Sequence, residues 1–202
     1  MASNLPFQLG ITGGIGSGKS VLAKIFSLLD VPVYESDTEA RKLYLKPEIR
    51  KQVESLLGTK AYRPDGQPDT AYIAAEIYAK PSLRESLNAI LHPAVGADYQ
   101  TWLEKQSHPY ILKVAALLFE ANIAGKLDFT ALVVSPMSLK KERVAARDPQ
   151  RPSSQIDAIM KNQWSDEKKM ALADAILYND ENHSLIEQVN QLNTRILQMA
   201  SK

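Results

Sequence analysis

The sequence predicts an α/β fold in which a mainly parallel, five-stranded sheet is flanked by helices, and three observations lead to this class. Short apolar runs alternate along the chain with segments of helical periodicity, a pattern typical of parallel sheets built from βαβ units. A glycine-rich turn joins the first apolar run to the first helical segment. Between the second and third strand candidates, about seventy residues have mostly helical periodicity. This segment is too long for one crossover connection and indicates a helical insertion.

Five segments are strand candidates because each is short, apolar and bounded by turn or polar residues. They are residues 7–11, 31–34, 110–114, 131–134 and 175–178. The first should be central, since ligands of open α/β sheets bind at the carboxyl ends of the strands. The second can lie beside the first, which would bring the acidic residues that follow it to the same edge of the sheet.

Helical periodicity defines the insertion and the C-terminus. The predicted helices are residues 38–45, 48–57, 70–79, 82–104 and 183–200, with a turn at 63–68. We predict that residues 1–37 and 106–202 form the core and that residues 38–105 form a helical subdomain. Residues 140–169, with eight basic and five acidic side chains, are predicted to form a lid.

A phosphate-binding loop follows the first predicted strand. The residues Gly13-Gly14-Ile15-Gly16-Ser17-Gly18-Lys19-Ser20 fit the P-loop pattern of Gly, four residues, Gly-Lys and Ser or Thr. Between a strand and a helix, such a loop turns backbone N–H groups toward one anion, and the helix N-terminus adds partial positive charge. The motif predicts a P-loop NTPase fold that binds ATP through residues 14–21, with Lys19 on the β- and γ-phosphates and Ser20 on Mg²⁺.

The rest of the chain favours a small-molecule kinase over other P-loop proteins. The Asp-x-x-Gly and Asn-Lys-x-Asp signatures of GTPases do not occur, and the fourth predicted strand runs into Ser135 rather than an acidic residue. A kinase needs a group that orients the acceptor hydroxyl and cations that neutralise charge in the transition state. Asp37, after the second strand, is one candidate for the first role. Its alternative is to N-cap a helix that begins at Thr38, and spacing does not decide between the two.

Arg143 and Arg147 are four residues apart and therefore share one face of a helix. The planar guanidinium group matches phosphate oxygens, so both are candidates for stabilising the transferring phosphoryl group from a lid. Periodicity alone favours the alternative that they belong to a solvent-exposed basic face.

Composition argues against several other classes of protein. The net charge is +1, so no overall field favours nucleic acid or a membrane surface. The chain has no cysteine, which excludes disulfides and thiolate metal sites and is compatible with a reducing compartment. Residues 1–6 carry no Lys or Arg, and no segment approaches the roughly 20 apolar residues of a membrane span. We expect a cytoplasmic protein without nucleic-acid or membrane partners; these features do not bear on oligomeric state.

Several blocks of sequence resemble the dephospho-CoA kinase family along nearly the whole chain. They are residues 9–20, 31–37, Ala40-Arg41, Leu91-His92-Pro93 (a turn in the family pattern), 117–120, Glu142-Arg143, Arg147-Asp148, 162–164, Ala173-Asp174 and 178–180. The resemblance implies that ATP phosphorylates the ribose 3′-hydroxyl of dephospho-CoA, giving CoA and ADP in the last step of coenzyme A biosynthesis. Another P-loop kinase of a nucleoside, nucleotide or small metabolite is the alternative.

The same resemblance implies roles for individual side chains. It implies that Asp37 is the base or aligning group for the 3′-hydroxyl and that Asn179 lies near adenine. The residues implied to stabilise the transferring phosphoryl group are Lys19, Arg143 and Arg147. Those implied to bind the acceptor are Arg41, His92 and Glu120. Two of these keep structural alternatives: His92 as a helix-to-turn residue before a proline, and Asn179 as a cap after the last strand.

The chain departs from the family pattern at three positions. Glu35 replaces the first Asp of an acidic pair, Ala116 stands where Pro is common, and Ser135 stands where the fourth strand usually ends in Asp. A Mg²⁺ role for that last acid is therefore absent or lies elsewhere. None of the three changes removes the phosphate loop or Asp37.

Overall fold

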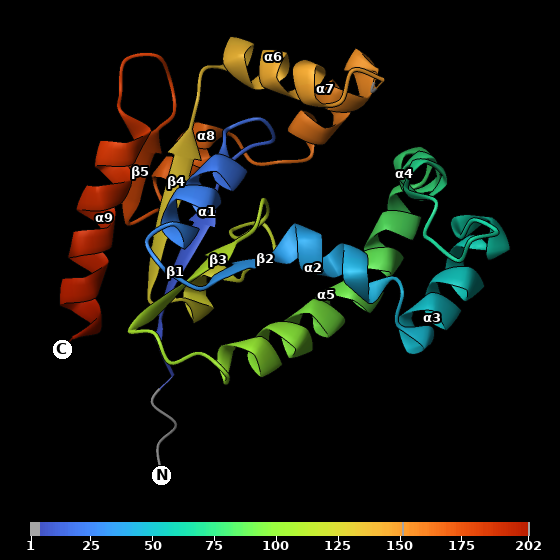
Figure 1. Cartoon of the computed structure of the whole chain (residues 1–202). Coiled ribbons are helices and arrows are strands. Elements are labelled where there is room, and N and C mark those ends of the chain that lie inside the picture. The colour runs from blue at the N-terminus through green and yellow to red at the C-terminus, as the bar shows by residue number, and fades with distance from the viewer. Residues whose placement is uncertain (1–4, 151, 202) are drawn as a thin grey trace. The chain divides into compact units, whose positions relative to one another are not determined.

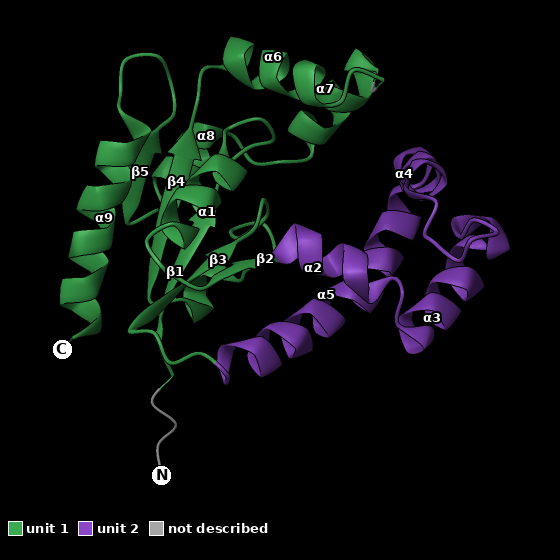
Figure 2. Ribbon diagram, viewed as in Figure 1, with its two compact units in different colours: residues 1–35, 106–202 green, residues 36–105 purple. Residues whose placement is uncertain are grey.

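The computed structural model describes residues 5–150 and 152–201. Residues 1–4, Arg151 and Lys202 lie outside the described residues, so the expectation about the N-terminus and one basic residue of the 140–169 stretch have no structural counterpart here. The chain divides into two compact units, Met1–Glu35 with Gln106–Lys202 (unit 1) and Ser36–Lys105 (unit 2), as Figure 2 shows. Each unit is described by itself.

Unit 1 is built on a sheet of five parallel strands (Figure 1). The strands are β1 (Phe7–Thr12), β2 (Val33–Glu35), β3 (Tyr110–Val114), β4 (Phe129–Val134) and β5 (Ala175–Tyr178). Their order is β2-β3-β1-β4-β5. The predicted fold class is confirmed, and β1, which leads into the phosphate loop, is the central strand as expected.

The position of β2 differs from the expectation. β3 lies between β1 and β2, because Gly10 of β1 and Tyr34 of β2 are both in register with Lys113 of β3. A strand has two hydrogen-bonding edges, and those of β1 are taken by β3 and β4. The prediction that β2 adjoins β1 is therefore wrong. Since neighbouring strands are about 4.8 Å apart, β2 ends roughly 10 Å from β1.

One hydrophobic core joins a face of the sheet to two helices, α1 (Lys19–Ser27) and α9 (Leu185–Ala200). Every second residue of β1 and β4 enters this core, as the two-residue period of a strand requires. α1 contributes Leu22, Ala23 and Phe26, and α9 contributes Val189, Leu192 and Ile196, which are the three- and four-residue spacings of a buried helix face. This packing fixes the start of α1, and with it the end of the phosphate loop.

The remaining elements of unit 1 follow β3 and β4. They are η2 (Ala124–Lys126), α6 (Met137–Arg147), α7 (Ser153–Lys161) and α8 (Asp166–Met170). The last three occupy the stretch that the sequence predicts to be a lid.

Unit 2 consists of α2 (Ser36–Leu43), α3 (Pro47–Leu57), η1 (Thr59–Ala61), α4 (Thr70–Ala79) and α5 (Pro81–Leu103). Its own core comprises Ile49, Val53, Leu57, Ala61, Tyr62, Ile73, Leu87 and Leu91. The turn expected at Leu91-His92-Pro93 is wrong, because these residues lie inside α5. The proline removes one N–H group from the helix, and buried Leu87, Leu91 and Tyr99 on either side hold the helix in place.

None of the helices in the described part of the chain is long and apolar enough to cross a membrane.

Lys113 of β3 gives the sheet a testable electrostatic property. The residue is 5% exposed, and burial, with a smaller contribution from the charge of Lys126, lowers the pKa of its ammonium group to about 8. A lowered lysine pKa means that the unfolded chain binds more protons than the folded one between about pH 8 and 10.5, so this group makes the protein more stable as the pH rises through that window.

We expect Lys113→Met, which is uncharged and one atom shorter, to raise the free energy of unfolding at pH 7 by up to about 3 kcal/mol. The gain over the wild type should shrink toward pH 10. Urea unfolding of both proteins at pH 7, 8.5 and 10 measures this difference directly. A variant less stable than the wild type at pH 7 would mean that the ammonium makes stabilising contacts that exceed its cost of burial.

Candidate active site

The phosphate loop connects β1 to α1 and requires glycine at two positions for two separate reasons. Gly16 and Gly18 have φ angles of +79° and +97°, a region that residues with a side chain rarely adopt. A Cβ at Gly16 would lie 2.3 Å from the carbonyl oxygen of Lys140, and one at Gly18 would lie 1.9 Å from Nδ2 of Asn179. The loop is therefore shaped by its neighbours as well as by its own backbone.

Several backbone donors of the loop are unpaired. Within the described residues, the N–H groups of Gly16, Gly18 and Ser20 make no hydrogen bond to another backbone group. α1 begins at Lys19 and has no acidic residue in its first turn, so the partial positive charge of its N-terminus is not offset there. Unpaired amides at a helix N-terminus form a site for an anion such as phosphate.

Lys19 and Ser20, the two side chains predicted to act on phosphate and Mg²⁺, come directly after Gly18. Lys19 folds back over the loop, and its Nζ donates to the carbonyl oxygens of Gly13 at 2.8 Å and Gly14 at 3.1 Å. Ser20 is exposed on the first turn of α1, as is Val21, whose N–H donates to Gly18. An exposed serine hydroxyl is an oxygen ligand of the kind that Mg²⁺ takes alongside water and phosphate oxygens.

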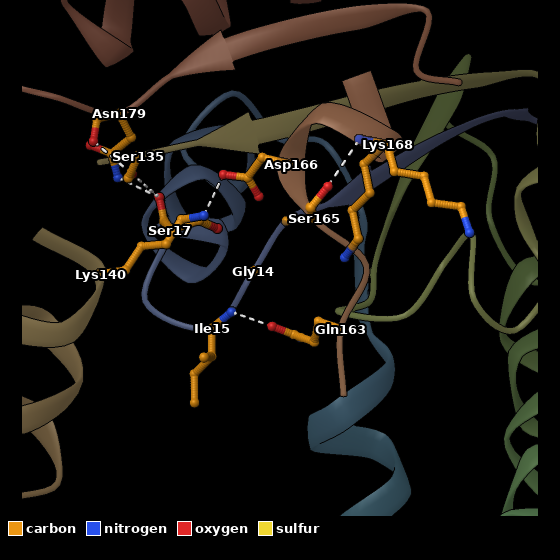
Figure 3. Close-up of polar contacts among 12 residues, drawn as sticks. Gly14, Ile15, Ser17, Ser135, Lys140, Gln163, Ser165, Asp166, Lys168 and Asn179 are labelled. Atoms are coloured by element: carbon orange, nitrogen blue, oxygen red, sulfur yellow. Dashed lines mark hydrogen bonds and ion pairs between the residues drawn. The ribbon is translucent and has the colours of Figure 1, made fainter. Parts of the chain in front are cut away.

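A second set of contacts holds the far side of the loop (Figure 3). The Nδ2 of Asn179, just after β5, donates to the carbonyl oxygen of Ser17 at 2.8 Å, and the Oγ of Ser135 lies 3.1 Å from the same oxygen. Arg143 reaches this cluster from α6: its guanidinium donates to the Oγ of Ser135 and to the carbonyl oxygen of Asn179, each at 3.1 Å. The cluster thus joins the ends of β4 and β5 to the loop.

The sequence prediction treats Arg143 and Arg147 alike, but the structure distinguishes them. Arg143 is bonded to the cluster that holds the loop, whereas Arg147 pairs with its neighbour Asp148 at 3.2 Å and leaves 60% of its side chain exposed.

Ser135 is buried at the position where the resemblance suggests an acid. Its hydroxyl lies 2.7 Å from the carbonyl oxygen of Asn179, so it binds backbone groups of the site.

Unit 1 contains two neighbouring cavities, and the first of them is lined in part by the phosphate loop. One, of about 240 Å³, is lined by Gly14, Ile15, Met137, Lys140, Met160, Gln163, Trp164, Ser165, Asp166 and Glu167. The other, of about 380 Å³, is lined by Val134, Ser135, Pro136, Met137, Lys140, Asp166, Glu167, Met170, Tyr178 and Asp180. Lys140 lies in both, almost completely buried and paired with Asp166. A hydrogen bond from His183 is the main cause that lowers the pKa of the Asp180 carboxyl, so this edge of the second cavity is anionic at neutral pH.

Glu120, which the resemblance assigns to the acceptor side, forms an ion pair and a hydrogen bond within unit 1. Its Oε1 pairs with the Nζ of Lys169 at 2.8 Å and accepts from the N–H of Trp164 at 2.9 Å. Its Oε2 is buried without a hydrogen-bond partner.

The other predicted acceptor-side residues belong to unit 2. Asp37 and Arg41 are exposed and four residues apart on α2, and His92 is exposed on α5. Because α2 begins at Ser36, Asp37 lies inside its first turn instead of capping a helix from Thr38. A carboxylate in the first turn stabilises the helix end through its dipole, so Asp37 has a structural contribution in addition to the catalytic role that the resemblance implies.

Sequence reasoning missed three residues that contact the loop or line its cavities: Lys140, Gln163 and Asp166. Gln163 accepts the N–H of Ile15 at 2.9 Å across a separation of 148 residues. Gln163 falls in one of the resembling blocks, and Lys140 in a basic stretch, but neither signal gives the partner.

Comparisons with known proteins identify the family of this chain. The family model described as "Dephospho-CoA kinase" matches residues 7–184. The dephospho-CoA kinase of Mannheimia succiniciproducens is 34% identical, with 98% of this chain and 95% of that protein covered. The dephospho-CoA kinase of Bacteroides fragilis (strain YCH46) is 33% identical, with 93% and 92% covered.

Solved structures agree at the level of the fold. A Thermus thermophilus protein shares 26% identity and a TM-score of 0.81, over 96% of this chain and 98% of its own. Dephospho-CoA kinase from Campylobacter jejuni superposes with a TM-score of 0.60 at 17% identity, over 94% and 96% of the two chains. Shikimate kinase from Acinetobacter baumannii superposes with a TM-score of 0.55 at 14% identity, over 100% and 98%, so the fold alone does not separate these kinases. The family match and the relatives above 30% identity do separate them, and they show that this chain belongs to the dephospho-CoA kinase family.

Proposed function

We propose that this protein transfers the γ-phosphoryl group of ATP to the ribose 3′-hydroxyl of dephospho-CoA, releasing CoA and ADP as the last step of coenzyme A biosynthesis. The observation that carries the proposal is the phosphate loop, with its unpaired amides and folded-back Lys19, in a chain of this family. The absence of cysteine fits a cytoplasmic location, which we also propose.

The loop and Lys19 would bind the triphosphate. The amides of Gly16, Gly18 and Ser20 supply donors to phosphate oxygens, and the Nζ of Lys19 would exchange its two carbonyl acceptors for β- and γ-phosphate oxygens. Contacts that strengthen as charge develops on the transferring group lower the barrier. Mg²⁺ bound to ATP would neutralise phosphate charge, and Ser20 is the side chain that we propose to hold it.

Asp37 would orient the acceptor hydroxyl. A carboxylate is a weak base for a sugar hydroxyl. In a loose transition state the proton leaves late, and alignment by a hydrogen bond is then the main contribution. Arg41, His92 and Glu120 are proposed to bind the acceptor, and Asn179 to lie near adenine while it holds the loop.

The lid arginines give a prediction in which structure and sequence differ. We expect Arg143→Ala to lower kcat about 10-fold, the size of one charge-assisted hydrogen bond, with a smaller change in the KM for ATP. Arg147→Ala should lower kcat less, because its side chain is exposed and paired only locally. The matched control is Lys141→Ala, on the same helix and in an exposed pair with Asp157. If both arginine variants turn over like the control, neither arginine stabilises the transferring phosphoryl group.

The reaction itself is tested with purified protein, ATP, Mg²⁺ and dephospho-CoA. ADP release should depend on dephospho-CoA, and mass spectrometry should find a product one phosphoryl group heavier. Parallel reactions with nucleosides, nucleotides and shikimate test the alternative. Phosphorylation of one of these in preference to dephospho-CoA, or ATP binding without transfer to any acceptor, would overturn the proposal.

A further inference from the structure

The third residue of the phosphate loop is held by a side chain from outside it. The Oε1 of Gln163, in the short connection between α7 and α8, accepts the N–H of Ile15 at 2.9 Å, and Figure 3 shows the two atoms facing each other. The amides of Gly16, Gly18 and Ser20 have no backbone acceptor in the described part of the chain. Gln163 therefore engages one donor at the edge of the loop and leaves these others for an anion.

The residue that follows Gln163 is fixed by a buried ion pair. The N–H of Trp164 donates to the Oε1 of Glu120 at 2.9 Å, and the same oxygen pairs with the Nζ of Lys169 at 2.8 Å. Lys169 is fully buried. The ammonium group of Lys168 lies 3.4 Å from the centre of the Trp164 ring. The hydrogen bond to the N–H of Trp164 fixes the peptide group that joins Trp164 to Gln163, so only the backbone ψ and the side-chain torsions of Gln163 lie between the Glu120–Lys169 pair and the Gln163 amide group.

The Glu120–Lys169 pair is also connected to the residue that precedes the loop. The Nζ of Lys169 donates to the carbonyl oxygen of Ala116 at 3.3 Å, and the same oxygen accepts the hydroxyl of Thr12 at 3.3 Å. Thr12 is the last residue of β1, directly before the loop. The contacts form a closed ring through Thr12, Ala116, Lys169, Glu120, Trp164, Gln163 and Ile15. The ring holds the chain at Thr12 and at Ile15 and so restricts the first three residues of the loop, which one isolated hydrogen bond does not do.

The chemistry of the acceptor also fits a site for a polyanion. An amide oxygen accepts a hydrogen bond without carrying a formal charge. A carboxylate at the same place would accept the Ile15 N–H equally well but would repel a triphosphate on the adjoining amides. Glutamine therefore suits a residue that must hold the loop while leaving its positive potential intact.

We propose that Gln163 is a positioning residue that holds the phosphate loop in its ATP-binding conformation before ATP arrives, and that the Glu120–Lys169 pair fixes Gln163 for this purpose. The inference rests on the proposed function only in taking the ligand of the loop to be a nucleoside triphosphate. In this assignment the family-like block at residues 162–164 acts on the loop through the Ile15 amide.

Two substitutions separate the hydrogen bond from the charge. Gln163→Met keeps the length of the side chain and removes the acceptor. We expect exchange of the Ile15 amide hydrogen, measured by NMR in the free protein, to become about 2- to 10-fold faster, the range set by one net hydrogen bond. ATP affinity, measured by calorimetry without an acceptor substrate, should fall by a similar factor, while kcat at saturating ATP changes less than about twofold.

Gln163→Glu should behave differently, with slow exchange at Ile15 retained and ATP affinity still reduced by the added charge. Gln191→Met, an exposed glutamine on α9, is the control for the glutamine-to-methionine change and should match the wild type. Gln163→Asn, one methylene shorter, is the alternative if Gln163→Met does not fold.

Three results would overturn the assignment. Unchanged Ile15 exchange in both Gln163→Met and Gln163→Asn would show that the hydrogen bond does not order the loop. Weaker ATP binding with unchanged exchange would make Gln163 a direct ligand of the nucleotide, and tighter ATP binding would make it an obstruction. Since both readouts are independent of dephospho-CoA, a failure of the proposed reaction would be seen separately, in the transfer assay with wild-type protein.

Discussion

Lys19→Ala should lower turnover about 100-fold or more, the loss expected when one preorganised donor to the developing charge is removed. In the free protein the Nζ of Lys19 is held by the carbonyl oxygens of Gly13 and Gly14, so the ammonium group already lies at the loop when ATP binds. The effect should appear in kcat more than in the KM for ATP, because the contact strengthens as charge builds on the transferring group. Initial rates at saturating ATP and dephospho-CoA measure it.

Lys24→Ala is the matched control, since this lysine lies on the same helix and is exposed. It should keep wild-type turnover. Thermal melts of both variants separate loss of function from loss of fold. Wild-type turnover by Lys19→Ala would contradict the assignment of the loop as the catalytic phosphate site.

The second large effect is expected for Asp37→Asn, which keeps the shape of the side chain and removes its charge. If Asp37 aligns the acceptor hydroxyl, loss of that alignment should lower phosphoryl transfer by about 100-fold, while ATP affinity measured by calorimetry stays within about twofold. ATP would then bind to a folded protein that cannot use it.

The control must account for the position of Asp37 in the first turn of α2, where a carboxylate also stabilises the helix. Glu39→Gln removes a charge from the same turn and should reproduce any loss that comes from the helix dipole. Equal, small effects of the two substitutions would make Asp37 a structural residue. A large loss confined to Asp37→Asn supports the catalytic role.

The elements of the fold were largely predictable because their signals are local. The spacing of apolar residues identified all five strands, and β3 and β5 have the predicted bounds. The order of strands was not predictable in this way. That β3 separates β1 from β2 depends on pairings across about 80 to 100 residues, and periodicity within a segment carries no information about which edge it meets. Helical periodicity correctly predicted one helix over residues 82–104, whereas the turn that the family pattern implies at Leu91-His92-Pro93 is wrong, because packing on both sides of Pro93 outweighs the local cost of proline in a helix.

The residues of the site also differ in whether their signals in the sequence are local. The phosphate loop could be predicted because its glycines, Lys19 and Ser20 are contiguous and each has a distinct physical role. The contacts of Gln163 with Ile15 and of Asn179 with Ser17 span 148 and 162 residues, and an amide side chain has no sequence pattern that names its partner. The sequence therefore predicts where phosphate binds more readily than what keeps that place in shape.

The strand order also sets the sequence of events during synthesis on the ribosome. β1 is made first, yet both of its neighbours, β3 and β4, come after residue 109, so this strand remains without a partner while unit 2 is translated. Unit 2 is continuous in the chain and has its own apolar core, and such local contacts form with little loop-closure entropy. We expect the helical insertion to collapse early in translation. β1 and the phosphate loop that follows it emerge first but should be ordered among the last.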